Sequence, residues 1–289
     1  MAEQEIIVKK KSQFRDVLHR FLKNKAAVIS LFFILLLIIC AIFPEQIAPY
    51  SYSQQNYSET FISPCLAHPF GTDNYGRDIL SRVIYGTRIS IGIGLVAVAL
   101  SCVFGIVIGA AAGFYGSTTD NIIMRIIDIM LAIPSILLMM AIVTALGNGA
   151  VNLTIAIAIS SVPGYARIVR ASVMTEKELE YIEAARSSGA TDLKIIMRHI
   201  LPNCLAPIIV QATMSIATAI LSIASLSFVG LGISPPTPEW GSMLNDAQSF
   251  MRDHWFVVTF PGLMIMLTVF AFNLLGDGLR DALDPKLKT

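Results

Sequence analysis

The chain has 289 residues, 55% of them hydrophobic and only 14% charged, with a net charge of +1. Water-soluble domains carry about 25% charged residues, so this composition excludes an ordinary soluble protein. The near-zero net charge gives no electrostatic basis for binding nucleic acid, and the mean hydropathy of +0.68 indicates a surface that faces a lipid bilayer.

The leader, residues 1–25, is predicted to be a basic amphipathic segment on the cytoplasmic face of the membrane. Its apolar residues recur at helical spacing, and its Lys and Arg residues lie largely off that stripe. The stripe consists of Phe14, Val17, Leu18, Phe21 and Leu22. A short helix packed on protein is the alternative interpretation.

Six apolar stretches follow, each long enough to cross a bilayer core, which takes roughly 20 helical residues. They cover residues 26–43, 89–115, 121–146, 150–172, 206–231 and 256–276. Lys and Arg are enriched in the cytoplasmic segments of membrane proteins. With both termini inside, 17 of the 21 Lys and Arg residues are cytoplasmic. The sequence therefore predicts a multi-pass protein of the cytoplasmic (inner) cell membrane with N-in, C-in topology.

Two patterns within these spans concern the packing and shape of the helices. Gly105, Gly109 and Gly113 are four residues apart and predict a face on which another helix approaches closely. Prolines in or near three spans each remove a backbone hydrogen bond and are expected to kink their helices: Pro134, Pro163 and Pro261.

Two charged residues lie near the inner end of the third span. Arg125 and Asp128 are three residues apart, so they can pair on one face of a helix. We expect a structural ion pair, and a substrate-binding role is the alternative.

The loop 175–202, with the sequence TEKELEYIEAARSSGATDLKIIMRHILP, is too polar to lie in the membrane. Thr175 and Glu178 have the spacing of a capping box and predict the start of a helix, which Gly189 is placed to end in a left-handed conformation. Thr191 is expected to cap a second helix with an apolar face of Leu193, Ile196, Met197, Ile200 and Leu201. Two short amphipathic helices joined at a glycine suit docking into a groove of a soluble partner.

This loop resembles the EAA loop of ABC importer permeases, in which Glu-Ala-Ala is followed by three residues, glycine, nine residues and Ile-x-Leu-Pro. The sequence departs from that pattern at His199, where the family has Ile. In the family the loop forms the coupling helix, which lies in a cleft of the ATP-binding subunit. The resemblance assigns this coupling to Glu183, Ala184, Ala185, Gly189, Leu193, Leu201 and Pro202.

Further segments resemble the dipeptide, oligopeptide and nickel branch of these permeases, and in particular its second permease subunit, which has six spans and an N-terminal extension. The similar segments surround residues 70–90 and 227–241, and the Asp284-Pro285 ending is also similar. Segments 44–88 and 232–255 are expected outside, where they are candidates for contacting a solute-binding protein. The candidate residues are Gly71, Thr72, Asp73, Gly76, Arg77, Asp78, Glu239 and Trp240.

The resemblance implies an all-α membrane protein with six transmembrane helices, the type I ABC importer permease fold and a cytoplasmic coupling-helix loop. After the leader, it divides the chain into a first transmembrane helix with an external loop (26–87), an ABC transporter type-1 transmembrane domain (88–277) and a cytoplasmic tail (278–289). The implied partners are a second homologous permease subunit, two ATP-binding cassette subunits, an external solute-binding protein and the lipid bilayer, without nucleic acid.

The implied function is to form half of the pathway of an ATP-driven importer, with peptides as the favoured substrate class. Nickel, metal chelates and glutathione are the alternatives. No catalytic residue and no cofactor are expected on this chain, because ATP and Mg²⁺ would be bound by the partner ATPase subunits.

Sequence motifs of other classes are absent. No Gly-Lys dipeptide occurs, so the chain lacks the phosphate-binding GxxxxGK[ST] loop. The scattered cysteines and histidines indicate neither a disulfide framework nor a metal site. From composition alone, an ion-gradient-driven secondary transporter or a channel is the competing interpretation, although neither mid-membrane charges nor inverted repeats are visible. The cysteines are Cys40, Cys65, Cys102 and Cys204.

Overall fold

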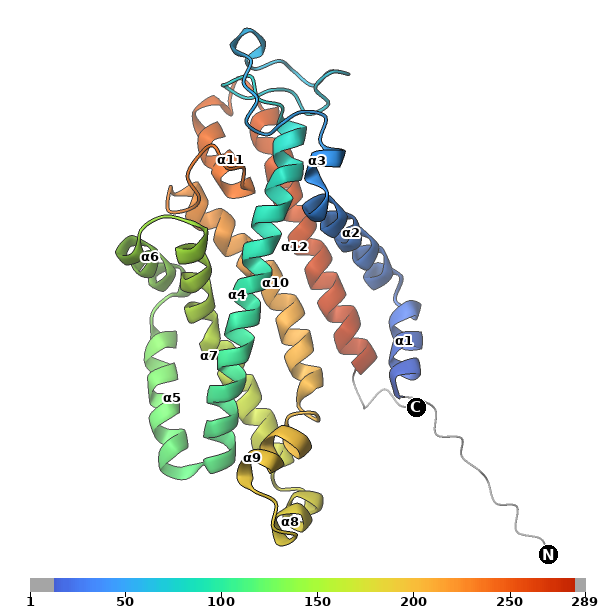
Figure 1. Cartoon of the computed structure of the whole chain (residues 1–289), viewed down its shortest axis with the longest axis vertical. Coiled ribbons are helices and arrows are strands. Elements are labelled where there is room, and N and C mark those ends of the chain that lie inside the picture. Colours follow the sequence, from blue (N-terminus) through green and yellow to red (C-terminus); the bar gives the residue numbers. More distant parts are fainter. Residues whose placement is uncertain (1–12, 284–289) are drawn as a thin grey trace, which may run out of the picture.

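The structure is a computed structural model that describes residues 13–283. Residues 1–12 of the leader, the side chain of Phe14, and the ending at Asp284 and Pro285 lie outside the described residues. Within the described range the chain is almost entirely helical (Figure 1). Five helices are long and apolar enough to cross a membrane, and the bent pair α5 and α6 would make a sixth.

The long helices follow the predicted order. The first four predicted spans correspond to α2 (Lys25–Ile42), α4 (Ile79–Tyr115), α5 (Ser117–Ala132) with α6 (Ser135–Leu146), and α7 (Ala150–Glu176). The last two correspond to α10 (Leu205–Phe228) and α12 (Phe256–Leu283). The shorter helices are α1 (Gln13–Lys23), α3 (Pro44–Ile47), α8 (Glu180–Ser187), α9 (Asp192–Ile195) and α11 (Trp240–Ala247).

The third predicted span is not one continuous helix. α5 and α6 meet at an angle of 90°. Pro134 has no N–H to donate, and its ring favours an extended residue before it, which is the conformation of Ile133. The stretch predicted over 121–146 is therefore a bent helix pair, and the bend lies at Pro134, where a kink was expected. Pro163 and Pro261, by contrast, lie inside the continuous helices α7 and α12.

The glycine seam predicted in the second span is confirmed, and its partner is α7. A Cβ atom built on Gly105 would lie 2.2 Å from the Cβ of Tyr165, and one on Gly109 would lie 2.5 Å from the carbonyl oxygen of Ala166. Gly113 is similarly close to α7. Because glycine has no side chain at these positions, the two backbones pack in direct contact.

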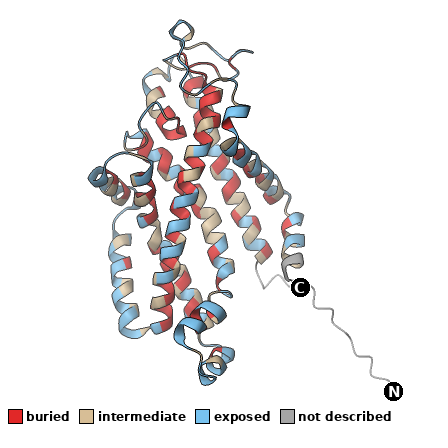
Figure 2. Cartoon of the chain, in the orientation of Figure 1, coloured by how far each residue is buried: buried red, intermediate tan, exposed pale blue. Residues whose placement is uncertain are grey.

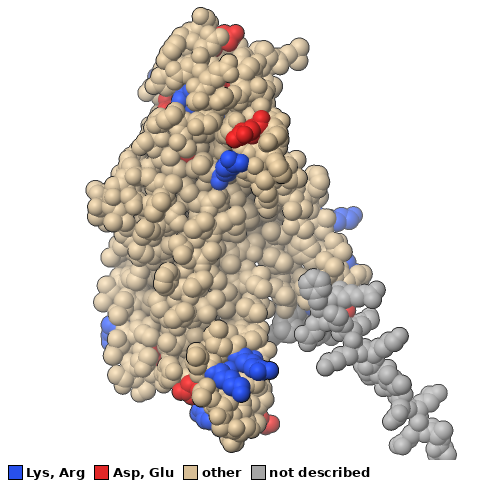
Figure 3. Space-filling model, viewed as in Figure 1, with Lys and Arg blue, Asp and Glu red and all other residues tan. Residues whose placement is uncertain are grey.

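The two ends of the bundle differ (Figure 1). α8 and α9 project from one end, together with the ends of α4, α5 and α7. The loop 48–78 and α11 lie at the opposite end. On the face in Figure 3, charged side chains gather toward the two ends, and the surface between them is nearly uncharged. This arrangement suits a bundle that crosses a bilayer.

Many residues on the helices between the two ends are exposed, and Figure 2 colours them pale blue. Many of these exposed residues are large and apolar. On α2 and α4 they include Ile29, Phe32, Ile39, Val103 and Val107, each more than half exposed. In lipid such side chains lose nothing by exposure, whereas in water they would form an apolar patch of unusual size.

The predicted apolar stripe of the leader is divided between two environments. In α1, Phe21 is buried against Ala27 and Ala282, with Val17 packed beside them. Leu18 and Leu22 are exposed. The helix thus packs on protein with one part of its stripe and presents the other part outward.

Candidate functional site

The EAA loop, residues 175–202, forms a compact element at one end of the bundle. It contains α8, a turn at Gly189, and α9, which continues as a turn of π-helix over Ile196–Ile200. The two helices of the prediction are therefore present.

Gly189 ends α8 as predicted, with φ of +78°. Its N–H donates to the carbonyl of Arg186 at 3.0 Å, and the N–H of Ala190 donates to the carbonyl of Ala185 at 3.1 Å. This pair of bonds is a Schellman motif, which satisfies the last carbonyls of a helix and reverses the chain. The motif fixes how α8 and α9 lie relative to each other.

An isoleucine cluster attaches the EAA loop to the bundle. Ile182 of α8 and Ile195 and Ile200 of the second helix are buried with Phe114 of α4 and Val173 of α7. Burying such side chains contributes about 1.5–3 kcal/mol each. The loop therefore cannot move as a free connector without breaking apolar contacts with α4 and α7.

A polar network holds the base of the same loop. The hydroxyl of Tyr181 donates to the carboxylate of Glu176, and the amide of Asn203 donates to Glu176 at 2.9 Å and to the Tyr181 oxygen at 2.8 Å. Burial, with the Glu176 carboxylate beside it, raises the pKa of Tyr181. The network joins the end of α7, the start of α8 and the start of α10.

The remaining face of the EAA loop is exposed. Leu193 and Met197, one helical turn apart, are 70% and 60% exposed. Glu183 and Ala184 are exposed on α8. Of the other predicted residues, Ala185 and Leu201 pack beside the isoleucine cluster and Pro202 is exposed.

Two predicted details of this loop are wrong. α7 continues to Glu176, so Thr175 donates back to Ala171 inside that helix at 3.2 Å and starts no new one. Thr191 occupies the predicted N-cap position, but its side chain makes no capping hydrogen bond. The apolar face predicted for the second helix is divided between two environments, because Ile196 and Ile200 are buried whereas Leu193 and Met197 are exposed. Ile195, which lies outside the predicted face, is buried.

The predicted pairing of Arg125 with Asp128 is also wrong. Asp128 accepts a 2.6 Å hydrogen bond from Arg167 of α7. A second pair, Asp120 with Arg170, joins the same two helices nearer the EAA loop. Asp128 therefore pairs with a residue of another helix, and its i, i+3 spacing from Arg125 does not determine its partner.

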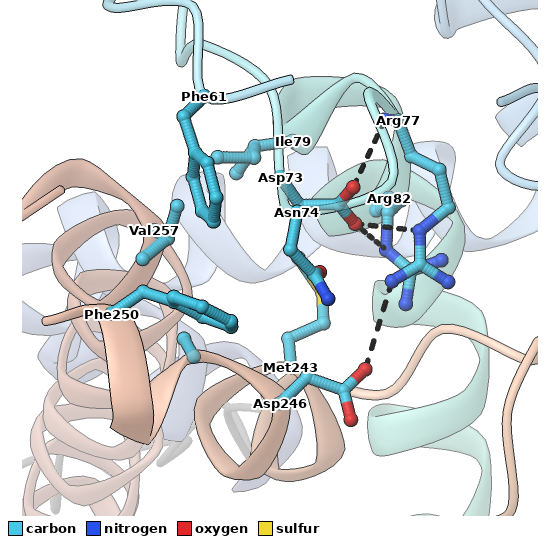
Figure 4. A pocket seen from close by; sticks show the side chains of 11 residues that line it. Phe61, Asp73, Asn74, Arg77, Ile79, Arg82, Met243, Asp246, Phe250 and Val257 are labelled. Carbon is cyan, nitrogen blue, oxygen red and sulfur yellow. Dashed lines mark hydrogen bonds and ion pairs between the residues drawn. The ribbon is translucent and has the colours of Figure 1, made fainter. Parts of the chain in front are cut away.

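At the opposite end, the cap is formed by residues 48–78 and α11. Asp73 accepts from the Arg77 Nε at 2.6 Å and lies 3.7 Å from Arg82, while Arg77 lies 3.7 Å from Asp246 of α11 (Figure 4). Burial raises the pKa of Asp246, and the charges of Arg77 and Arg82 oppose that shift. These ion pairs attach the loop to both α4 and α11.

The other candidate residues at this end are interior parts of the cap. Asp78 caps α4 by accepting from the backbone N–H of Ser81 at 2.7 Å. Glu239 caps α11 through the N–H groups of Gly241 and Ser242. The buried Trp240 donates to the carbonyl of Val83 at 3.0 Å. These side chains shape the cap from within and are not on its surface.

Thr72 and the two glycines complete the set. Thr72 is buried and accepts from the N–H of Ile62 at 2.8 Å. Gly71 and Gly76 have φ of +79° and +67°, and a Cβ on Gly76 would overlap the carbonyl of Asn56. Gly71, Thr72 and Gly76 thus belong to a tightly folded loop that precedes α4.

Several residues at the two ends of the bundle were not predicted from the sequence. His68 contacts Asp78 at 2.9 Å, and Asp246 completes the ion-pair network. Tyr181 of the EAA loop and Asn203, which follows the loop, were not predicted either. The position of Asn203, directly after the Ile-x-Leu-Pro end of the motif, was the one available signal; nothing in the sequence indicated the partner of Asp246.

Two family profiles match the chain. The one described as binding-protein-dependent transport system inner membrane component matches residues 105–289. The one described as the N-terminal transmembrane domain of oligopeptide transport permease C matches residues 12–69.

Three relatives illustrate the similarity along the whole chain. The dipeptide transport system permease protein DppC of Haemophilus influenzae is 47% identical over 294 residues, covering 100% of both chains. The di/tripeptide transport system permease protein DppC of Pseudomonas aeruginosa is 49% identical, covering 96% of this chain and 93% of the relative. The glutathione transport system permease protein GsiD of Escherichia coli is 48% identical, covering 96% and 92%.

Among solved structures, a chain of the MetNI methionine ABC transporter in an inward-facing conformation has the same fold. The TM-score is 0.55 at 21% sequence identity, over 70% of this chain and 97% of that chain. With a family profile over most of the chain and relatives matched over 92–100% of their length, this multi-pass protein belongs to the binding-protein-dependent transport system inner membrane components and has the fold of ABC importer permeases.

Proposed function

We propose that this chain forms half of the translocation pathway of an ATP-driven importer for di- and oligopeptides. The observation that carries the proposal is the EAA loop, in which Gly189 joins two short helices that are anchored to the bundle and leave Leu193 and Met197 exposed. An exposed apolar pair on an anchored element suits docking into a cleft of a soluble ATPase subunit.

The isoleucine cluster provides the mechanical connection for this coupling. When two ATPase subunits close around ATP and Mg²⁺, the docked loop moves with them. The isoleucines of this cluster move with the loop and displace Phe114 of α4 and Val173 of α7. They do so because close-packed side chains cannot shift one at a time. This chain supplies binding and transmission, and the bond cleavage of ATP takes place on the partners.

A second permease subunit and a solute-binding protein complete the proposed assembly. The ion pairs of Asp73, Arg77 and Asp246 stiffen the cap as a platform for the binding protein. The exposed side chains at this end are better placed for contact than the buried Glu239 and Trp240, and they include Tyr57, Leu66 and Met251.

Peptides are the substrate class that the relatives' names favour, since two of the three describe di- or tripeptide transport. Glutathione is the second candidate, because a glutathione transport permease is 48% identical. Both ligands are short peptides with free charged ends, so the same pathway chemistry serves either.

The test is uptake by proteoliposomes that contain the assembled importer and its binding protein. We expect uptake of a labelled dipeptide that requires ATP and persists when ionophores collapse all ion gradients. Excess unlabelled dipeptide should compete more strongly than glutathione. Uptake that follows an ion gradient without ATP would contradict the ATP-driven proposal, and stronger competition by glutathione would reassign the substrate.

A further inference from the structure

The exposed side of α7 lies between its contacts with α5 and α10. On one flank, Arg170 binds Asp120 of α5. On the other flank, Ile168 lines a groove of about 400 Å³ with Gln211 and Met214 of α10. Arg167 lies between these flanks, so its side chain points out of the wall that α5, α7 and α10 form.

Arg167 forms an ion pair with Asp128, and this pair is exposed. Its guanidinium lies 2.6 Å from the carboxylate of Asp128, and the two side chains are 53% and 55% exposed. Exposing such a pair to hydrocarbon is costly, so charged side chains on membrane helices face water or protein. This side of the wall therefore does not face lipid chains.

α5 carries two distinct exposed stripes. Asn121, Arg125 and Asp128 recur at i, i+4 and i+7 and form a polar stripe. Ile122, Ile126 and Ile129 recur with the same spacing one residue later, and each is more than half exposed. One helix thus presents a water-compatible side and a lipid-compatible side next to each other.

We propose that the pathway face, defined by Asn121, Arg125, Asp128 and Arg167, lines the aqueous pathway and contacts the charged ends of the transported peptide. The inference rests on the proposed function. A peptide offers an ammonium group, which complements the Asp128 carboxylate, and a carboxylate, which the guanidinium groups of Arg125 and Arg167 bind through two parallel hydrogen bonds.

A purely structural role for the pair is the competing explanation. The Asp120–Arg170 pair already ties α5 to α7, and its side chains are only 15% and 30% exposed. The two pairs join the same helices and differ in exposure. The covered pair is therefore a natural control for the exposed one.

Thiol accessibility tests the face without requiring transport. In the assembled importer with the native cysteines replaced by alanine, Arg125→Cys and Ile126→Cys place a thiol on adjacent stripes at nearly the same depth. We expect a charged, membrane-impermeant methanethiosulfonate to modify Arg125→Cys at least tenfold faster, and a zwitterionic dipeptide to slow that reaction. Equal rates, or a fast rate that the dipeptide leaves unchanged, would overturn the proposal.

A charge exchange then separates peptide contact from helix tying. The double variant Asp128→Arg with Arg167→Asp keeps an interhelical pair and reverses its polarity; Asp120→Arg with Arg170→Asp is the control. We expect the first exchange to lower dipeptide uptake at least tenfold while the partner subunits are retained. The control exchange should take up the dipeptide faster than the first exchange does. Wild-type uptake by the first exchange would overturn the inference. A wild-type importer that takes up no dipeptide would instead contradict the proposed function. In that case the difference in rate between Arg125→Cys and Ile126→Cys, which needs no dipeptide, would still test whether this face lies in water.

Discussion

At the scale of single residues, Gly189 controls the shape of the EAA loop. Its φ of +78° is strained for any L side chain, yet a Cβ there meets no atom within 4 Å. A substitution therefore acts through backbone conformation alone, at about 1–3 kcal/mol for a residue that disfavours this region. The control is asparagine, which tolerates the left-handed conformation.

We predict that Gly189→Val loses most of its ATPase partner and its uptake, while Gly189→Asn keeps both. The expected loss is at least tenfold, since about 1.4 kcal/mol corresponds to tenfold in affinity. Pull-down of the tagged importer with uptake measured in parallel provides the comparison. Equal behaviour of the two variants would show that the turn geometry is unimportant.

Cysteine reactivity reports on the packing of the same loop. Burial, together with the nearby Glu176 charge, raises the pKa of Cys204 to about 11. At pH 8 only about 10⁻³ of such a thiol is thiolate, the reactive form. Cys65 at the cap is exposed.

A charged, impermeant alkylating reagent should therefore modify Cys65 from outside and leave Cys204 unmodified in inside-out vesicles at pH 8. Modification of Cys204 should increase as the pH approaches 11. Peptide mass spectrometry distinguishes the two sites. Rapid reaction of Cys204 at pH 8 would contradict the buried packing, and access to Cys65 only from inside would contradict the orientation.

At the scale of elements, the contact between α4 and α7 depends on missing side chains. Gly105→Ala places a Cβ 2.2 Å from that of Tyr165, whereas Gly92→Ala on the same helix meets nothing within 4 Å. Alanine favours a helix by about 0.5–1 kcal/mol over glycine, but overpacking costs about 1–3 kcal/mol. We predict a lower unfolding temperature for Gly105→Ala and an equal or higher one for Gly92→Ala, measured by thermal unfolding in detergent. Similar unfolding temperatures for the two variants would mean that α4 and α7 can move apart at the glycine seam without loss of stability.

Elements governed by local chemistry could be predicted from the sequence. The apolar runs located the spans, and the spacing of Gly105, Gly109 and Gly113 indicated the seam, because both patterns follow helical periodicity. The left-handed turn at Gly189 followed from its place after a polar helix. A kink at Pro134 was expected, but its size of 90° was not. A proline removes a backbone hydrogen bond, and the packing of the neighbouring helices then decides how far the chain bends.

Features set by contacts between distant segments could not be predicted. Asp128 pairs with Arg167, 39 residues away, and not with its neighbour Arg125. The cap buries Glu239 and Trp240 because α11 packs against α4, which no local pattern indicates. In the EAA loop, tertiary packing against α4 and α7 selected Ile195 for burial and left Leu193 exposed.

At the scale of the whole molecule, α4 connects the two functional ends. Its 37 residues correspond to about 55 Å of helix. Asp78 of the cap precedes its first turn, and Phe114 in its last turn belongs to the isoleucine cluster. A single helix, supported by α7 along the glycine seam, thus joins the proposed binding-protein platform to the proposed ATPase contact.

The contact between the EAA loop and an ATPase subunit is the claim on which the coupling depends. Leu193 is 70% exposed, so Leu193→Asp leaves the fold of this chain intact, yet it places a charge where an apolar contact is expected. Burial of a leucine contributes about 1.5–3 kcal/mol, so its loss should lower ATPase affinity at least tenfold. Leu66→Asp, at a fully exposed position of the cap, is the matched control.

The most direct measurement is co-purification of the ATPase with tagged permease carrying each change. We predict that Leu193→Asp retains the second permease subunit but loses the ATPase, and that Leu66→Asp retains both. Retention of the ATPase by Leu193→Asp at the wild-type level, with uptake unchanged, would contradict a coupling role for this loop.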